Sequence, residues 1–233
     1  MNRDEKITRG AGAPLEVHEF DGVGVVYPSD GAAGTWIAGN EYGITLALLN
    51  WNDVCARAAD TGKARSRGLV IPALIHSRSL PGLQSAFEVL DLEGMSPFRM
   101  VGVFPVEKEI WGWRWDSTQL EFQVHGWESR HWFSSSLSDQ KAESLRGTAC
   151  GNAWSDSDAG SAPWLRRLHA SHAGGPGPFS LCVHREDVQT LSYTEMTCTP
   201  ETVAINHFLA SPCRLGSGHL MEIPRVSSWP KIA

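Results

Sequence analysis

Three runs with the alternation of β-strands follow one another in the middle of the chain, at residues 98–104, 109–115 and 120–125. In the second run, tryptophans stand at positions 111, 113 and 115, which places three indoles on one face of a strand. Aromatic residues at this spacing are typical of a sheet face that packs against helices, and we expect that packing here. The alternative is that this face lines a pocket for an acyl chain or a flat ligand.

A β-hairpin is predicted nearer the N-terminus. Residues 36–38 and 44–50 have the pattern of its strands, and the turn at 40–43 ends in Gly43, which adopts a positive φ without steric cost. Residues 46–49 are apolar at successive positions, and a strand of this kind is covered on both faces. Further strand-like runs occur at 23–27, 179–184, 190–198 and 202–208.

Helical patterns are found at residues 66–91, 137–150 and 162–172. Pro81 suits a first helical turn within the first of these segments. The apolar residues on one face of that segment are Leu83, Phe87 and Leu90. The tail from Arg214 shows little periodicity. Together these elements predict an α+β protein with one domain, residues 1–233.

Composition argues against several classes of partner. The chain has 233 residues, a formal net charge of −6 and no run of basic residues, which argues against nucleic acid because phosphate neutralisation requires clustered lysine and arginine. No apolar stretch approaches the roughly 20 residues of a membrane span, and the charged N-terminus is unlike a signal peptide. The five cysteines are odd in number and widely spaced, which favours reduced thiols in a cytoplasmic protein.

Two blocks near the N-terminus carry a resemblance to a known family. The tetrapeptide Asn-Arg-Asp-Glu occupies positions 2–5, and the block 34–52 contains the predicted hairpin, whose second strand ends at Asn50. With these blocks in this order, the chain resembles the NRDE family, which includes the transport and Golgi organization protein 2 group. The resemblance implies an αββα four-layer sandwich of the N-terminal-nucleophile hydrolase kind, and a scaffold for amide (C–N) hydrolysis or acyl transfer.

The nucleophile of that family is a cysteine at the start of the mature chain, one strand ahead of the tetrapeptide. Its side chain would attack a carbonyl, and its α-amine, with an unperturbed pKa of about 8, would act as the base. Here Met1 directly precedes the tetrapeptide. We therefore expect the first strand and its cysteine to be missing and the chain as written to be inactive. Either the true start lies upstream at a Met-Cys, or the chain is a shortened form that binds a ligand without catalysis.

The resemblance also assigns roles to individual residues. Arg3 would lower the pKa of the cysteine and Asp4 would orient the α-ammonium group, the alternative being a capped turn with a surface ion pair. Asn50 would donate a hydrogen bond to a developing oxyanion, the alternative being a strand-terminal asparagine that bonds its own turn. Serines at 134–136 stand where a second oxyanion asparagine is expected. The residues expected to contact the substrate are Asn2, Glu5, Trp36 and His131.

The sequence predicts neither a metal nor a cofactor. His169 and His172 are spaced by one helical turn but have no carboxylate or cysteine at the usual zinc spacing. Cys55 has no neighbouring histidine and is expected to be a structural thiol. The expected ligand is a small amide, acyl or other hydrophobic molecule, and the non-catalytic alternative would hold acyl-CoA, lipid or haem. The oligomeric state stays open.

Overall fold

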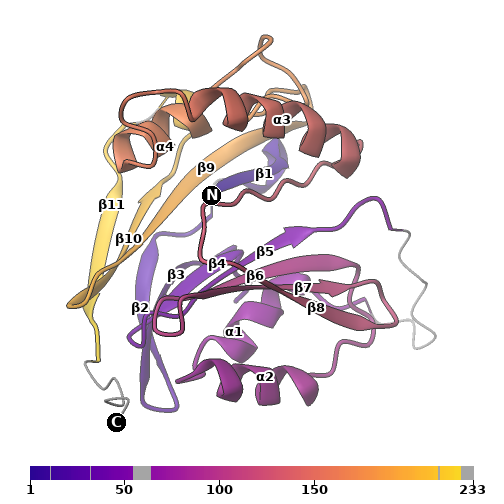
Figure 1. The fold of residues 1–233 in the computed structure, drawn as a ribbon. Helices are drawn as coiled ribbons and strands as arrows, with labels where there is room; N and C mark the ends of the chain where they lie inside the picture. The colour runs from indigo at the N-terminus through magenta and orange to yellow at the C-terminus, as the bar shows by residue number, and fades with distance from the viewer. Residues whose placement is uncertain (11, 32, 55–63, 215, 227–233) are drawn as a thin grey trace.

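The computed structural model describes residues 1–10, 12–31, 33–54, 64–214 and 216–226, so Cys55 lies outside the described residues. Two antiparallel sheets form its centre (Figure 1). The four-stranded sheet has the order β1 (Asn2–Lys6), β9 (Val188–Cys198), β10 (Thr202–Phe208) and β11 (His219–Pro224). The seven-stranded sheet has the order β2 (Leu15–Phe20), β3 (Val23–Pro28), β4 (Ile37–Asn40), β5 (Thr45–Asn50), β6 (Phe98–Phe104), β7 (Glu109–Trp115) and β8 (Leu120–His125).

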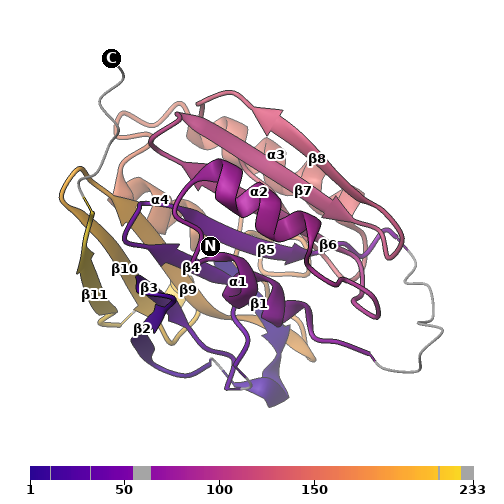
Figure 2. The ribbon, with the colours of Figure 1, turned by 90° about the horizontal axis from the view of Figure 1, so that it is seen from below.

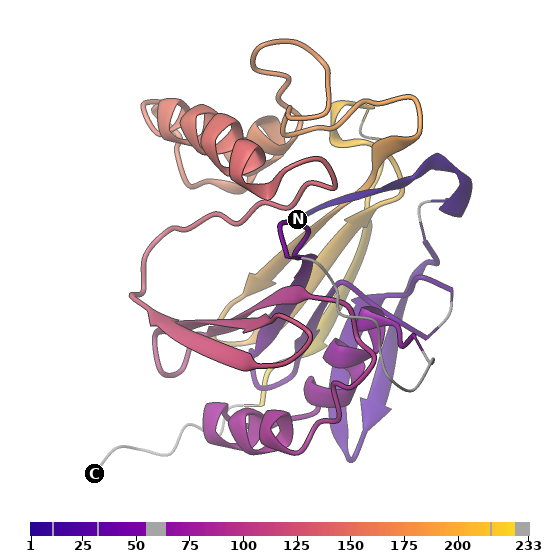
Figure 3. The same ribbon diagram turned by 90° about the vertical axis from the view of Figure 1, so that its right-hand side faces the viewer.

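Helices cover the outer face of each sheet and complete four layers (Figures 1 and 3). α1 (Val70–Leu74) and α2 (Leu80–Glu88) lie on the seven-stranded sheet, as Figure 2 shows from that side, and α3 (Asp139–Ala153) and α4 (Ala162–His169) lie over the four-stranded sheet. Short 3₁₀ turns are η1 (Ile7–Arg9), η2 (Arg67–Leu69) and η3 (Pro212–Arg214). This arrangement confirms the predicted αββα sandwich. None of the helices in the described part of the chain is long and apolar enough to span a membrane.

The tryptophan face of β7 packs against the helix layer, as expected. Trp111 and Trp113 belong to the main hydrophobic core, and Phe87 of α2 stacks on Trp113 with ring centroids 5.5 Å apart. Trp115 is partly buried against the same core and donates its indole hydrogen to the carbonyl of Met95. The three indoles therefore fill the space between sheet and helices, where the alternation of β7 directs them.

The predicted hairpin is formed by β4 and β5, and its turn is built around a buried asparagine. Asn40 accepts hydrogen bonds from the backbone of Tyr42 and Ile44, and its amide donates to the carbonyls of Ile75 and Ser77 in the helix layer. Gly43 has a φ of 83°, the conformation that glycine adopts without strain. The turn thus fixes both the hairpin and its position on the helices.

The two sheets contact each other along one side of the sandwich. An apolar cluster there joins Leu15 and Val26 of β2 and β3 to Val203, Ile205 and Ile223 of β10 and β11. Because residues alternate between the faces of a strand, each of these strands turns its other face away from the cluster. The opposite side of the sandwich, between β1 and β5–β6, contains the cavity described below.

The tetrapeptide 2–5 lies within β1, at the edge of the four-stranded sheet. Its strand partner among the described residues is β9, with Arg3 opposite Ser192 and Asp4 opposite Thr190. The alternative of a capped turn with a surface ion pair is therefore wrong: the segment is extended, and Arg3 is only 8% exposed. The register shifts between Arg3 and Asp4, an irregularity that often occurs beside binding sites.

Several predicted boundaries need correction. The helix expected over 66–91 is broken into η2, α1 and α2, because Ser79 caps a new helix start by accepting a hydrogen bond from the backbone of Gly82, and Pro81 favours a first turn. The strand expected at 179–184 is wrong, since this segment forms only isolated bridges at Val183 and His184. Three strands were not predicted, β1, β2 and β11; each buries few side chains, which weakens its alternation.

Candidate functional site

A cavity of about 630 Å³ lies between the two sheets and under α3 and α4. All of the residues predicted to form a site line it, although they come from separate parts of the sequence. They are Asn2, Arg3, Asp4, Glu5, Trp36, Asn50 and His131. Apolar side chains from both walls complete the lining, among them Leu49, Val101, Val103, Leu165 and Leu168. The cavity therefore combines charged groups from β1 with apolar walls, a composition typical of sites for small organic ligands.

Strand alternation sends the β1 side chains in two directions. Arg3 and Glu5 lie on one face, where Arg3 contacts Trp36 of the other sheet. Asn2 and Asp4 lie on the other face, where they contact the helix layer and the segment before β9. Arg3 and Asp4 were expected to act on the thiol and on the α-ammonium group of one cysteine, but the strand turns them to opposite faces.

Arg3 is held in place from three sides. Its guanidinium group lies 4.5 Å above the ring of Trp36, donates to the carbonyl of Gly10 at 2.8 Å and approaches the carboxylate of Glu5 at 3.6 Å. Burial lowers the pKa of Arg3, and Glu5 opposes that shift. Because an arginine remains charged at neutral pH, this side chain presents a fixed positive charge to the cavity.

Asp4 is paired with two residues that the sequence did not indicate. It accepts a hydrogen bond from the Thr190 hydroxyl at 2.6 Å, and its second oxygen lies 3.6 Å from the guanidinium of Arg146 on α3. Burial raises the pKa of Asp4, whereas Arg146 and Thr190 lower it. Neither partner is near Asp4 in sequence, and only the packing of α3 over β1 brings Arg146 to it.

The α-amine of Met1 is buried beside the cavity and donates to the carbonyl of Thr194. Burial lowers the pKa of this amine from 8.0 to about 5, and the nearby charge of Glu195 opposes the shift. An amine with this pKa is uncharged at neutral pH and has a lone pair for accepting a proton. The thioether of Met1 itself has no acidic hydrogen and is not a nucleophile of the required kind.

The remaining predicted residues, Asn50, His131 and Asn2, differ in exposure and in the groups that they contact. Asn50 is exposed at the end of β5, which contradicts the expectation of a buried oxyanion donor. His131 is exposed and stacks on Phe133, with ring centroids 5.0 Å apart. Asn2 uses its amide to donate to the carbonyls of His169 and Leu181, which makes it a structural link between β1 and the helix layer.

The serines at 134–136 hold loops together. The hydroxyl of Ser134 accepts a hydrogen bond from the side chain of Asn52, and that of Ser136 accepts one from Arg185. Ser135 accepts a hydrogen bond from the backbone of Leu137. Each hydroxyl therefore accepts a hydrogen bond within the protein.

His172 has cysteine neighbours after all. The sequence suggested none, but the fold places Cys182, His184 and Cys213 around it, with the four side-chain ligand atoms within 4.8 Å of one another. His169, the other histidine at this spacing, packs on the ring of Tyr193. The sequence spacing gives His172 no cysteine neighbour, and the fold supplies two from segments distant in sequence.

The fold and the cavity together define an αββα sandwich with a ligand-sized cavity between its sheets. No family model and no curated protein matches the chain. Among solved structures, it is similar to penicillin V acylase from Agrobacterium tumefaciens, with 13% sequence identity and a TM-score of 0.44 over 95% of this chain and 74% of that chain. A likeness of this size says nothing about the activity or the ligand of this chain.

Proposed function

We propose that this chain is an NRDE-family scaffold for amide hydrolysis or acyl transfer, whose inter-sheet cavity binds a small molecule with a hydrophobic acyl group. The observation that carries the proposal is the convergence of all of the predicted site residues on one cavity. Arg3 supplies a fixed positive charge for the polar end of the ligand, and the walls formed by Leu49, Val103 and Leu165 suit an acyl chain.

Catalysis in this proposal requires a cysteine N-terminal to Asn2, and the chain as written binds its ligand without hydrolysing it. One observation supports the requirement. Within the described residues, β1 pairs with β9 on one side and its other edge has no strand partner, so a preceding strand would find room to pair there.

Ligand binding is tested by calorimetric titration with N-octanoylglycine and, as the short-chain comparison, N-acetylglycine. We expect the octanoyl compound to bind at least tenfold more tightly, because each buried methylene contributes about 0.8 kcal/mol. Ala47 lines the cavity on β5, and the A47F variant should fill it and weaken octanoyl binding at least tenfold. Val17 is 52% exposed on β2, outside the cavity lining, and V17F should bind like the wild type.

Equal binding by A47F and the wild type, or none by either, would remove the cavity as the ligand site. Product analysis of the same mixtures by mass spectrometry should find no glycine released by the chain that begins at Met1. Release of glycine by that chain would contradict the need for an upstream cysteine.

The alternative is a binding protein for a hydrophobic ligand such as acyl-CoA, lipid or haem, and the apolar walls favour it equally. It differs in predicting tight binding that no mature form of the protein converts to product. A haem titration followed by absorbance separates this ligand from the others. The described cysteines are free thiols, which supports our proposal that the protein works in the cytoplasm.

A further inference from the structure

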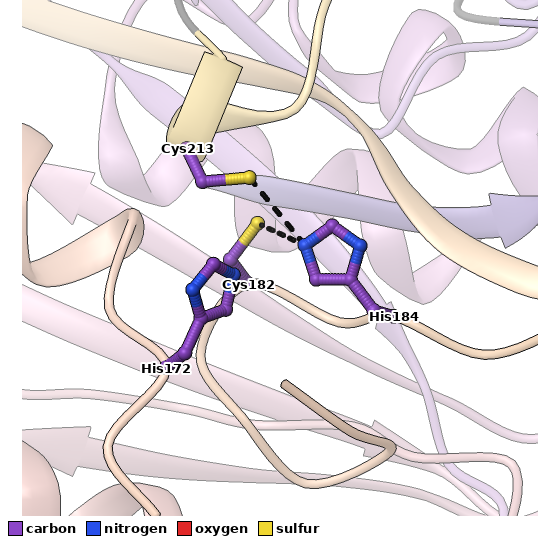
Figure 4. Close-up of side chains that lie close together, drawn as sticks. All are labelled: His172, Cys182, His184 and Cys213. Atoms are coloured by element: carbon purple, nitrogen blue, oxygen red, sulfur yellow. Dashed lines mark hydrogen bonds between the residues drawn. The ribbon is translucent and has the colours of Figure 1, made fainter. Parts of the chain in front are cut away.

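Four side chains from three separate segments meet on the side of the four-stranded sheet that faces α4. His172 follows α4, Cys182 and His184 lie in the irregular segment before β9, and Cys213 lies in η3. Figure 4 shows both thiols directed at the ring of His184, with the ring of His172 beside them. The rings of His172 and His184 are 4.9 Å apart and meet edge to face. We propose that these four residues bind a zinc ion.

The distances fit a tetrahedral ion. The sulfur of Cys182 lies 3.6 Å and that of Cys213 lies 3.4 Å from Nε2 of His184. In a tetrahedral zinc site, bonds of about 2.3 Å to sulfur and 2.0–2.1 Å to nitrogen place neighbouring sulfur and nitrogen ligands roughly 3.6 Å apart. The thiols and His184 therefore already stand at the separation that an ion between them would impose.

The donor set is that of structural zinc. Two thiols and two imidazoles make a Cys₂His₂ group, and sulfur with imidazole nitrogen selects zinc over the oxygen-seeking calcium and magnesium. Cys182 is buried, and the Nε2 atom of His172 is buried without a hydrogen-bond partner among the described residues. Such a nitrogen costs free energy unless something binds it, and a metal ion would do so.

The backbone around the cluster is already organised. The amide of Cys182 donates to the carbonyl of Ser171, and that of His184 donates to the carbonyl of Gly177. The intervening Val183 donates its amide to the Thr190 hydroxyl, which in turn donates to Asp4. An ion here would fasten the segment before β9 to α4 and η3, and so would hold the wall of the cavity that positions Asp4.

The test begins with protein purified under reducing conditions. Elemental analysis should find about one zinc ion per chain, and replacement by Co²⁺ should give the intense visible spectrum of a tetrahedral thiolate site. C182S and H184N should lose that spectrum and most of the metal. The matched controls are C198S and H76N, whose residues lie outside the cluster, and both should retain the full spectrum. A strong chelator should lower the Tm of the wild type and leave that of C182S unchanged.

Reduced wild-type protein that takes up no Co²⁺ in tetrahedral form would overturn the proposal. So would a spectrum that survives in both C182S and H184N. Cys182 and Cys213 are close enough to compete for a disulfide instead, and peptide mapping of the untreated protein checks this; a disulfide with no metal uptake after reduction also counts against the site. If the variants fail to fold, X-ray absorption of the Co²⁺-loaded wild type decides between two sulfur and two nitrogen ligands and any other set.

Discussion

At the scale of single residues, the unusual feature of this molecule is the number of polar groups buried around the cavity. Arg3, Asp4 and Arg146 are held by defined partners, whereas His207 is fully buried beside Trp36 and shares a hydrogen bond with Thr194. Such groups are stable in one protonation state only, so their titration must affect stability. This makes them the best places to test the structure.

His207 should make the protein sensitive to mild acid. Burial, with smaller effects from the charges of His219 and Arg3, lowers the pKa of His207 from 6.5 to about 4. Between pH 6.5 and about pH 4, His207 therefore binds a proton in the unfolded chain but not in the folded protein. The neutral His207 contributes about 3 kcal/mol to the free energy of unfolding above pH 6.5. This contribution is lost as the pH falls to about 4.

The measurement is urea unfolding of the wild type and H207N at pH 7 and pH 4.5. Asparagine keeps a polar atom near Thr194 but does not titrate, so the acid-induced loss should be smaller in H207N by about 2–3 kcal/mol. H76N, altered at a half-buried surface position, should lose as much as the wild type. An identical pH dependence in H207N and the wild type would contradict the burial of a neutral His207.

Asp4 and Arg146 should show strong energetic coupling. Removing the cation in R146M leaves a partly buried carboxylate without its ion pair, and also removes the hydrogen bonds that Arg146 makes to the carbonyls of Ser134 and Pro178. We expect a loss of about 3 kcal/mol for R146M and about 1–2 kcal/mol for D4N. The double variant should be at least about 1 kcal/mol more stable than the sum of the single losses implies. Additive losses would show that the pair does not interact.

At the scale of elements, a junction of hydrogen bonds joins the residues after β5 to the start of α3. Asp139 accepts hydrogen bonds from the backbone of Ser135 at 2.6 Å and of Asn52 at 2.7 Å. Asp53 reciprocates by accepting from the backbone of Asp139 at the start of α3. This exchange connects the strand end that bears Asn50 to the helix that bears Arg146.

The D139A variant should therefore lose about 3 kcal/mol of stability. Three backbone amides and the guanidinium of Arg99 lose a charged partner, and the helix start loses a favourable negative charge. D139N, which keeps one acceptor oxygen, should lose about half as much. Asp187 forms an exposed ion pair with Arg185, and D187A should cost at most about 0.5 kcal/mol. Urea unfolding measures all three, and a D139A loss as small as that of D187A would contradict the role of this junction.

Helices and strands were predictable from the sequence where the hydrophobic pattern of a segment matches the element that the segment forms. β6, β7 and β8 have the predicted bounds, because their alternation is strong and Asp116 closes the turn between the last two by accepting backbone hydrogen bonds. The segment 179–184 failed because its apolar residues are buried against α3 and α4, while the segment itself forms only isolated bridges. The helix at 66–91 failed because its apolar pattern continues across a cap at Ser79.

Only part of the site was predictable from the sequence. The residues of β1 are consecutive, so the tetrapeptide located one wall of the cavity, and Asn50 and Trp36 followed from the hairpin. Arg146, Thr190 and the cluster around Cys182 could not be predicted, because each is assembled from segments far apart in the sequence. The spacing of cysteine and histidine in these segments matches no local zinc motif.

At the scale of the whole molecule, ligand and fold should be thermodynamically linked. A compound that occupies the inter-sheet cavity binds only the folded protein, and at 100 times its Kd it should raise the free energy of unfolding by about 2.7 kcal/mol. Chemical unfolding with and without N-octanoylglycine measures this. The A47F variant, which should bind at least tenfold more weakly, should gain at most about 1.4 kcal/mol at that concentration. Stabilisation of A47F equal to that of the wild type would place the ligand outside the cavity.

The central claim is that this sandwich serves a cysteine that lies N-terminal to Asn2. The most direct test is intact mass measurement with N-terminal sequencing of the protein isolated from its natural source. The proposal predicts a mature chain that begins with cysteine, one strand ahead of the tetrapeptide at 2–5. A mature chain that begins at Met1 would contradict the N-terminal-nucleophile mechanism and leave the cavity as the site of a binding protein.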